Sequence, residues 1–267
     1  MSASVLTRGR SLSAPSIALA LRALRLTLRR PQFLIPLFLM PSIFLAVNTG
    51  GLTATTQLPG FPETTSFLAF QLPAAMVQSL MLSGLQAGIA VALEIESGFF
   101  DRIVTAPVPR LAIVAGRLMA AAVLGAGQVT FFLLVGVVFG ADMAGGLPGF
   151  VVVIVLGALA AVAFAAIGLA IAFRARQASI VQGLFPFVFA VLYLSSAFFP
   201  QELLMPPADT ISAINPLSYI ADGLRTPIAF GMDWVPILEG FLVTSGVIAV
   251  ASAAAVAGMR WRLADAA

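Results

Sequence analysis

The chain has 267 residues, of which 60% are hydrophobic and only 9% are charged, and its mean hydropathy is +1.06. Ordinary globular chains are about 45–50% apolar, so this composition predicts an integral membrane protein. Cysteine and histidine are both absent, which excludes thiol chemistry, disulfides and histidine catalysis and leaves no expected metal site. The formal net charge is +3, and all 14 basic residues are arginines that flank apolar stretches, as orientation signals do, so no nucleic-acid partner is expected.

Residues 1–30 contain six arginines and no acidic residue. This composition is compatible with a cleaved transit peptide. The pattern of residues 17–30 favours a different interpretation, an amphipathic helix that lies in the cytoplasmic headgroup layer. Its apolar stripe would be Ile17, Leu21, Leu24 and Leu28, and its basic flank would be Arg22, Arg25, Arg29 and Arg30.

Six apolar stretches are long enough to cross about 30 Å of hydrocarbon as helices. They cover residues 33–52, 67–93, 111–140, 147–173, 180–199 and 235–259. We therefore predict a single all-α transmembrane domain over residues 1–267, with the spans inside residues 33–259 and a short tail at residues 260–267.

The arginines predict the orientation of these spans. Under the six-span arrangement, 13 of the 14 arginines lie on one side of the membrane, and Arg225 is the exception. By the positive-inside rule that side is cytoplasmic, which places both termini in the cytoplasm of a multi-pass cell-membrane protein.

Polar side chains also occur within the predicted spans. Four glutamines there are expected to face protein or a cavity, and we considered them for a polar seam at a dimer axis: Gln71, Gln78, Gln86 and Gln128. Gly84 and Gly88 have the spacing of a small-residue helix contact. The aromatic residues of the fifth stretch would face lipid or line an apolar path.

A polar segment, residues 92–117 (ALEIESGFFDRIVTAPVPRLAIVAGR), separates the second and third spans. Charge is costly inside a bilayer, so this segment is expected to lie outside it. A helix over residues 94–105 would place Glu94, Gly98 and Asp101 on one face, and Pro107 would end it. The alternatives are an ordinary solvated loop and a surface that binds a partner.

Two motifs resemble those of ABC-2 type transporter permeases, especially the daunorubicin-resistance and drug-export branch. One is Glu94-x-Glu96-x-Gly98-x-x-Asp101-Arg102-Ile103-x-Thr105-Ala106-Pro107-Val108-x-Arg110. The other is Asn215-Pro216-Leu217-Ser218-Tyr219, followed by Asp222 and Arg225. In length and order of elements the resemblance covers nearly the whole chain.

The resemblance implies that the first motif is a cytoplasmic coupling helix that docks on a separate ATP-binding subunit. The residues carried over are Glu94, Glu96, Gly98, Phe99, Phe100, Asp101, Arg102, Ile103 and Pro107. Within it, Phe99, Phe100 and Ile103 would be apolar anchors, while Glu96, Asp101 and Arg102 would set the register by charge. Glu94 could instead pair with an arginine such as Arg117.

The second motif lies in residues 200–234, which are too interrupted for one span and too apolar for a free loop. The resemblance implies a re-entrant hairpin on the outer side, carried by Asn215, Pro216, Tyr219, Asp222 and Arg225. The alternative is an interfacial lid with no transport role. Ser212 or Asn215 is expected to cap a helix that has Pro216 in its first turn, and Asp222 could pair with Arg225.

The function implied is that of a permease subunit, paired with a second permease chain, that exports an amphipathic drug-like or lipid-like substrate. The chain has no GxxxxGK[ST] motif, so ATP and magnesium are expected in the partner subunit and the chain itself is not an enzyme. Export of a lipid-linked glycan is the alternative. An intramembrane enzyme or a proton-coupled carrier would need carboxylates deep in the spans, where only Glu239 is a candidate.

Overall fold

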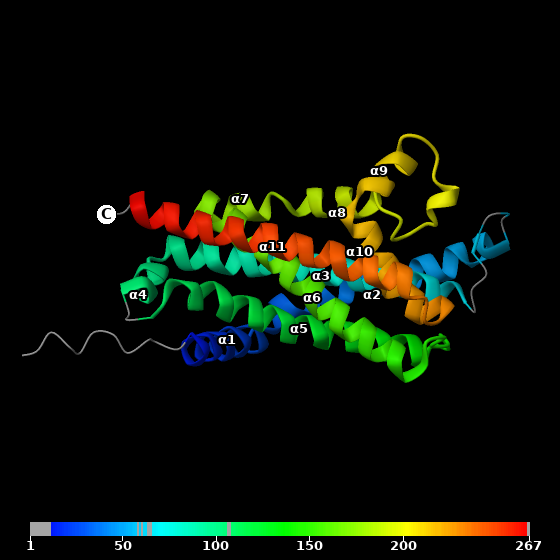
Figure 1. Cartoon of the computed structure of the whole chain (residues 1–267), viewed down its shortest axis with the longest axis horizontal. Coiled ribbons are helices and arrows are strands. Elements are labelled where there is room, and N and C mark those ends of the chain that lie inside the picture. Colours follow the sequence, from blue (N-terminus) through cyan, green and yellow to red (C-terminus); the bar gives the residue numbers. More distant parts are fainter. Residues whose placement is uncertain (1–11, 58, 60, 63–65, 106–107, 266–267) are drawn as a thin grey trace, which may run out of the picture.

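A computed structural model describes residues 12–57, 59, 61–62, 66–105 and 108–265 of the chain (Figure 1). Among these residues there are helices and no strand, in agreement with the predicted all-α class. The α-helices are α1 (Ser13–Leu28), α2 (Pro31–Leu52), α3 (Phe67–Glu96), α4 (Phe99–Thr105), α5 (Arg110–Val138), α6 (Gly146–Ala175), α7 (Ala178–Gln182), α8 (Phe185–Tyr193), α9 (Ala208–Ile214), α10 (Pro216–Arg225) and α11 (Trp234–Asp265).

Five helices are long and apolar enough to cross a membrane, namely α2, α3, α5, α6 and α11. Their bounds agree closely with five of the six predicted spans. The predicted fifth span, residues 180–199, is instead divided into α7 and α8, with a turn at Gly183 and Leu184 between them. Pro186 in the first turn of α8 has no N–H group, which explains why the backbone hydrogen bonds do not continue through this turn.

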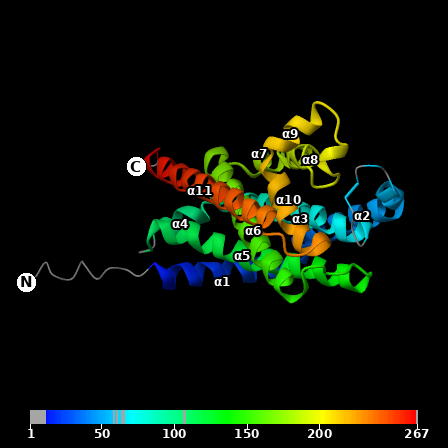
Figure 2. The ribbon, with the colours of Figure 1, turned by 45° about the vertical axis from the view of Figure 1, so that its right-hand side comes forward.

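Helix α3 is the centre of the bundle and packs against α2, α5, α6 and α10 (Figures 1 and 2). It crosses α6 at the predicted small-residue contact. A Cβ atom on Gly84 would lie 2.5 Å from the backbone of Phe164, and one on Gly88 would lie 2.6 Å from the carbonyl oxygen of Gly168. Such distances leave no room for a side chain, so the two glycines allow the backbones to approach closely.

The interior forms two apolar clusters at different levels of the bundle. One lies toward the end of the bundle that carries α10 and includes Leu72, Met76, Phe132, Leu156 and Ile220. The other lies toward α4 and includes Phe100, Ile113, Leu169, Phe173 and Met259. Long helices that contribute to both clusters, such as α3, α5 and α6, therefore connect the two ends of the molecule.

The arginine-rich ends of the helices gather at the end of the bundle that carries α4 and the C-terminus (Figure 1). Arg174 and Arg176, at the end of α6, lie over the Trp261 ring of α11 with guanidinium-to-centroid distances of 5.0 and 5.1 Å. Their common location agrees with the sidedness predicted from the sequence.

The polar side chains in the long helices turn inward. Gln71, Gln78 and Gln128 are buried within the single chain, which confirms that they face protein. Because this chain already covers them, they cannot form a seam on its outer surface. Gln86 lines a cavity, described below, at the α4 end of the bundle.

Candidate functional site

The polar segment between α3 and α5 folds as a helix end, a turn and a second short helix. Helix α3 continues to Glu96, and Gly98 then adopts a left-handed backbone with φ = +69°. No atom lies within 4 Å of a Cβ built on Gly98, so the backbone conformation, and not space, favours glycine there. The structure thus differs from the single helix predicted over residues 94–105, and Glu94 and Glu96 belong to α3.

Phe100 is part of the core and not an exposed anchor. Its side chain is fully buried, and its ring centroid lies 5.5 Å from that of Phe173 on α6. The Arg262 guanidinium of α11 lies 4.7 Å from the same ring, a cation–π contact. Phe100 therefore fixes α4 to α6 and α11 and has no free surface to offer a partner.

The other two predicted anchors are half-buried. Phe99 lies under the guanidinium of Arg22, 4.5 Å from its ring centroid, and so contacts α1. Phe99 and Ile103 both line a cavity inside the chain. The apolar side of α4 consequently faces the bundle.

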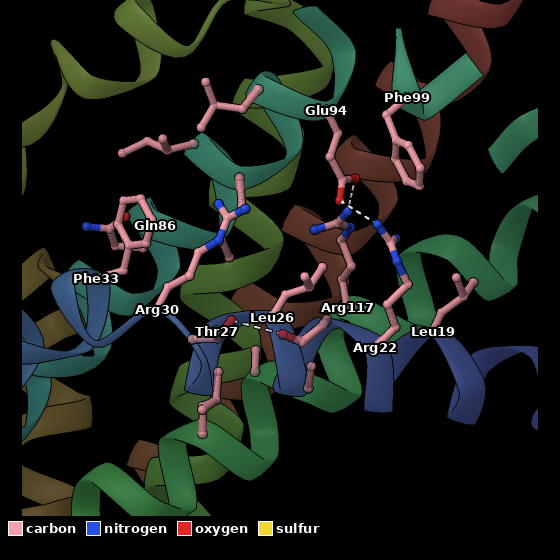
Figure 3. A pocket seen from close by; sticks show the side chains of 18 of the residues that line it. Leu19, Arg22, Leu26, Thr27, Arg30, Phe33, Gln86, Glu94, Phe99 and Arg117 are labelled. Atoms are coloured by element: carbon pink, nitrogen blue, oxygen red, sulfur yellow. Dashed lines mark hydrogen bonds and ion pairs between the residues drawn. The ribbon is translucent and has the colours of Figure 1, made fainter. Parts of the chain in front are cut away.

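Glu94 forms the predicted ion pair with Arg117 of α5 (Figure 3). The same carboxylate lies 3.6 Å from the Arg22 guanidinium of α1. Only 17% of the Glu94 side chain and 14% of the Arg117 side chain are exposed, so little water screens this pair. The cluster joins α1, α3 and α5 at one point.

Glu96 also acts within the chain. Its Oε1 atom accepts a hydrogen bond of 2.9 Å from the backbone N–H of Ala178, the first residue of α7. The sequence predicted that Glu96 sets the register of a partner by charge. In the structure it instead links the end of α3 to the start of the divided fifth segment.

Asp101 and Arg102 are both exposed, and Arg102 also lies at the edge of the cavity beside α4 that is described below. Asp101 pairs with Arg262 at 2.8 Å, yet 61% of its side chain is exposed. Arg102 is exposed and forms no ion pair within the described part of the chain. The outward surface of α4 is therefore made of Asp101, Arg102 and Thr105, whereas Pro107 lies outside the described residues.

The second motif forms α10 and its cap at the other end of the bundle, between α9 and a short π-helical turn, η3 (Thr226–Phe230). The side chain of Asn215 accepts a hydrogen bond from the Leu217 N–H, which confirms Asn215 as the helix cap, with Pro216 at the first position of α10. The hydroxyl of Tyr219 donates to the carbonyl oxygen of Ala213 at 2.8 Å. These bonds fix the bend between α9 and α10.

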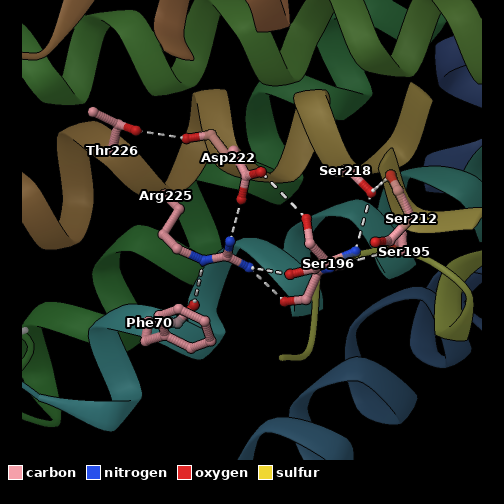
Figure 4. A network of polar contacts seen from close by, with 9 residues as sticks. Phe70, Ser195, Ser196, Ser212, Ser218, Asp222, Arg225 and Thr226 are labelled. Carbon is pink, nitrogen blue, oxygen red and sulfur yellow. Dashed lines mark hydrogen bonds and ion pairs between the residues drawn. The ribbon is translucent and has the colours of Figure 1, made fainter. Parts of the chain in front are cut away.

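Arg225 is the centre of a polar network that holds α10 in place (Figure 4). It forms the predicted ion pair with Asp222, and it donates to the carbonyl oxygens of Phe70, Ser196 and Ala197 at 3.2, 3.0 and 2.7 Å. Its guanidinium also lies 4.2 Å from the centroid of the Phe70 ring. One buried side chain thus connects α10, the start of α3 and the segment that follows α8.

The Asp222 carboxylate also accepts a hydrogen bond of 3.2 Å from the Ser196 hydroxyl. Burial by the surrounding chain raises the pKa of the Asp222 carboxyl, and Arg225 opposes that shift. The Asp222 side chain is 42% exposed, so water limits the effect. The geometry makes Asp222 and Arg225 a structural pair.

Helix α1 lies along α5 in both ribbon views (Figures 1 and 2). A Cβ on Gly116 of α5 would lie 2.8 Å from the carbonyl oxygen of Ser16, so the two helices touch closely there. Ile17, Leu21 and Leu28 of the predicted apolar stripe are exposed, as are Arg25, Arg29 and Arg30. The location of α1 in the headgroup layer stays a prediction.

A cavity of about 690 Å³ opens between α1, α2, α3, α4 and α5 (Figure 3). Its charged lining residues are Arg22, Arg30, Glu94, Arg102 and Arg117. Uncharged polar residues line part of the remainder, namely Thr27, Ser83, Gln86 and Ser97. Apolar side chains line the rest, among them Leu26, Phe33, Leu37, Ile113 and Leu124. The sequence did not predict this cavity, because its walls come from separate segments whose packing no local pattern reveals.

Two residues that hold α4 were also missed from the sequence. Phe173 lies near the end of an apolar span, where its pattern is that of any core residue. Arg262 was interpreted only as an orientation signal, although its position in the last turn of α11 places it beside α4. Nothing local in the sequence distinguishes an arginine that pairs within the chain from one that faces lipid.

These features define a helical membrane protein, in which a short helix with a polar outer surface joins two of the long apolar helices at one end of the bundle. The profile of the family described as "ABC-2 type transporter" matches residues 16–228, and the chain belongs to that family. It is similar to the daunorubicin resistance ABC transporter permease protein DrrB1 of Streptomyces coeruleorubidus, with 28% identity over 82% of this chain and 77% of the relative. It is also similar to the putative transport permease ycf38 of Porphyra purpurea, with 28% identity over 77% of this chain and 70% of the relative.

Proposed function

We propose that the chain is the transmembrane subunit of an ATP-driven exporter, that two permease chains assemble, and that each binds one ATP-binding subunit at α4. The ATP-binding subunit supplies the nucleotide site and the magnesium, while this chain supplies the path through the membrane. Membership in the ABC-2 type transporter family supports the transport role, and ABC-2 permeases are transport subunits and not enzymes.

The observation that carries the proposal is the way α4 is fastened to the bundle. Two adjacent residues in its first turn join it to different helices, since Phe100 packs on α6 and Asp101 pairs with Arg262 of α11. Just before it, Glu94 pairs with α1 and α5, and Glu96 bonds to α7. A push on the exposed surface of α4 would therefore reach α6 and α11 directly, and α1, α5 and α7 through the end of α3.

We further propose that α7 and α8 together make the sixth crossing. They follow one another along α3, from the α4 end of the bundle toward α10 (Figure 1). Irregular backbone at membrane depth is tolerated only where protein or water covers it. The backbone of the turn at Gly183 and Leu184 would therefore have to be shielded from lipid, and the second permease chain would shield it.

The face formed by α2 and α8 suits that second chain. Few side chains of α2 are buried within this chain, and most of α8 is exposed. The two helices meet where Phe44 lies 6.2 Å from Phe189, measured between ring centroids. Large apolar side chains cover this face, including Ile35, Leu39, Ile43, Phe187 and Val191.

The proposed substrate is amphipathic. The relative named for daunorubicin resistance favours a drug-like molecule, and a lipid-linked glycan stays the alternative. The scarcity of charged side chains in the long helices fits a path that does not bind a strongly charged molecule.

Reversing the charge of Arg102 is expected to release the ATP-binding subunit. The Arg102→Glu variant should retain no more than about a tenth of the partner in co-purification, since truncated or reversed interface residues often cost tenfold in affinity or more. The melting temperature of the purified chain should hardly change, because Arg102 is exposed and unpaired within the described residues. Substrate efflux should fall in parallel with the retained partner.

Arg260→Glu is the matched control, because Arg260 is also an exposed arginine near the same end but lies outside α4. It should keep both the partner and the efflux. If Arg102→Glu keeps both as well, α4 is not the docking helix.

Single cysteines test the proposed sixth crossing, and the chain has no cysteine of its own to remove. Thr105→Cys and Gln177→Cys should react with an impermeant maleimide only from the cytoplasm, whereas Ala144→Cys and Met205→Cys should react only from outside. All four positions are exposed in the chain. Labelling of Gln177 and Met205 from the same side would show that α7 and α8 do not cross.

A further inference from the structure

The cavity between α1, α2, α3, α4 and α5 carries more positive than negative charge. Four arginines and one glutamate line it, so three positive charges are left without a carboxylate inside the cavity. Glu94 is already engaged by Arg117 and Arg22. Arg30 and Arg102 form no ion pair within the described part of the chain.

The cavity also has an apolar end. From the Glu94 cluster it extends along α3 to Gln86 and Ser83, a distance of about 12–16 Å at 1.5 Å per helical residue. There Phe33 and Leu37 of α2 and Leu124 of α5 line it. The volume of about 690 Å³ lies within the range of about 300–1,000 Å³ that is usual for small-molecule sites.

Arg30 lies between the charged part and the apolar part of the cavity. It precedes Pro31, the first residue of α2, so it marks the level at which that membrane helix begins. Figure 3 shows its side chain extending into the cavity beside Gln86 and toward Glu94 and Arg117. A molecule with its anionic group between Arg30, Arg22 and Arg102 could therefore place a hydrocarbon chain against Phe33 and Leu37.

We propose that this cavity binds one anionic phospholipid of the cytoplasmic leaflet, with its phosphate held by Arg22, Arg30 and Arg102 and one acyl chain against the apolar end. The excess of positive charge favours an anion, and the apolar end favours a lipid over a soluble phosphate. The cavity lies at the arginine-rich end of the bundle, which is expected to face the cytoplasm, so the lipid would come from the cytoplasmic leaflet. The bound lipid would join α1 to α4 and so hold in place the helix that we propose for docking. Lipid binding can be measured on this chain alone and does not depend on the export function.

The test is native mass spectrometry of the full chain in detergent, titrated with dioleoyl phosphatidylglycerol or with dioleoyl phosphatidylcholine. The chain should retain one phosphatidylglycerol and release phosphatidylcholine, which has the same acyl chains. Arg30→Gln combined with Arg102→Gln should weaken phosphatidylglycerol binding about tenfold or more, because each arginine near an anionic lipid contributes measurably to its affinity.

Arg25→Gln combined with Arg29→Gln is the matched control. It removes the same charge from exposed arginines of the same end, but neither residue lines the cavity. This control should change the affinity by less than about twofold. Equal loss in both double variants, equal retention of phosphatidylcholine, or displacement of the lipid by excess inorganic phosphate would each overturn the proposal.

Discussion

Phe100→Ala is expected to destabilise the isolated chain by about 3–5 kcal/mol, the usual cost of truncating a buried phenylalanine. The ring is fully buried between α4, α6 and α11 and contacts both Phe173 and the Arg262 guanidinium. Its removal would leave a cavity at the point where α4 is fastened to the bundle. The measurement is the thermal unfolding of the purified chain in detergent, in the absence of any ATP-binding subunit.

Phe99→Ala is the matched control for this prediction. Phe99 is half-buried, and its ring makes a cation–π contact with the Arg22 guanidinium. Truncating Phe99 should therefore lower the free energy of unfolding by distinctly less than truncating Phe100. The opposite pattern would contradict the structure. If Phe100→Ala melts like the parent chain but no longer retains the ATP-binding subunit, then Phe100 is an exposed anchor, as the sequence motif alone suggested.

The long helices were predictable because their signal is repeated over many residues. Each of α2, α3, α5, α6 and α11 carries about 20 or more mostly apolar residues, which only a helix can place in a bilayer with its backbone bonds satisfied. Hydropathy averages over a window, so single polar residues such as Gln78 do not disturb it. The same averaging concealed the turn between α7 and α8, because Gly183 and Leu184 are themselves compatible with an apolar span.

Short-range pairs were predictable where one geometry relates the two residues. Asp222 and Arg225 are three apart on a helix and were expected to meet, and Asn215 precedes a proline in the pattern of a helix cap. The Glu94–Arg117 pair could be suggested because both ends belong to neighbouring spans. Pairs between distant segments, such as Asp101 with Arg262 and Glu96 with Ala178, depend on how the bundle packs and left no local signal.

The two phenylalanines of α4 show why a motif does not assign roles to its residues. Phe99 and Phe100 are adjacent and chemically identical, yet a helix directs neighbouring side chains about 100° apart. Phe100 consequently points into the core, while Phe99 lies at the edge of the cavity. Only the position of α4 relative to α6 and α11 decides which of them is exposed.

Replacing Arg225 is expected to have the other large effect. Arg225→Met keeps much of the apolar stem but removes every hydrogen bond of the guanidinium, leaving the carbonyl oxygens of Phe70, Ser196 and Ala197 without this donor. It also leaves Asp222 without its cation. Each buried carbonyl oxygen that loses its donor typically costs about 1–3 kcal/mol, and the guanidinium lies in the interior, with 4% of the Arg225 side chain exposed. The Asp222 carboxylate that remains is 42% exposed, so water offsets much of the cost of its lost cation.

Two control variants separate the charge of this network from its hydrogen bonds. Asp222→Asn should cost much less, because Arg225 keeps its three backbone acceptors and the Ser196 hydroxyl keeps a partner. Combining Arg225→Met with Asp222→Asn should recover part of the loss, since no carboxylate then lacks a cation. Thermal unfolding of the four proteins in detergent gives the coupling energy. Equal melting temperatures for Arg225→Met and the parent chain would mean that α10 is held by its apolar packing on α3, α6 and α11 and not by Arg225.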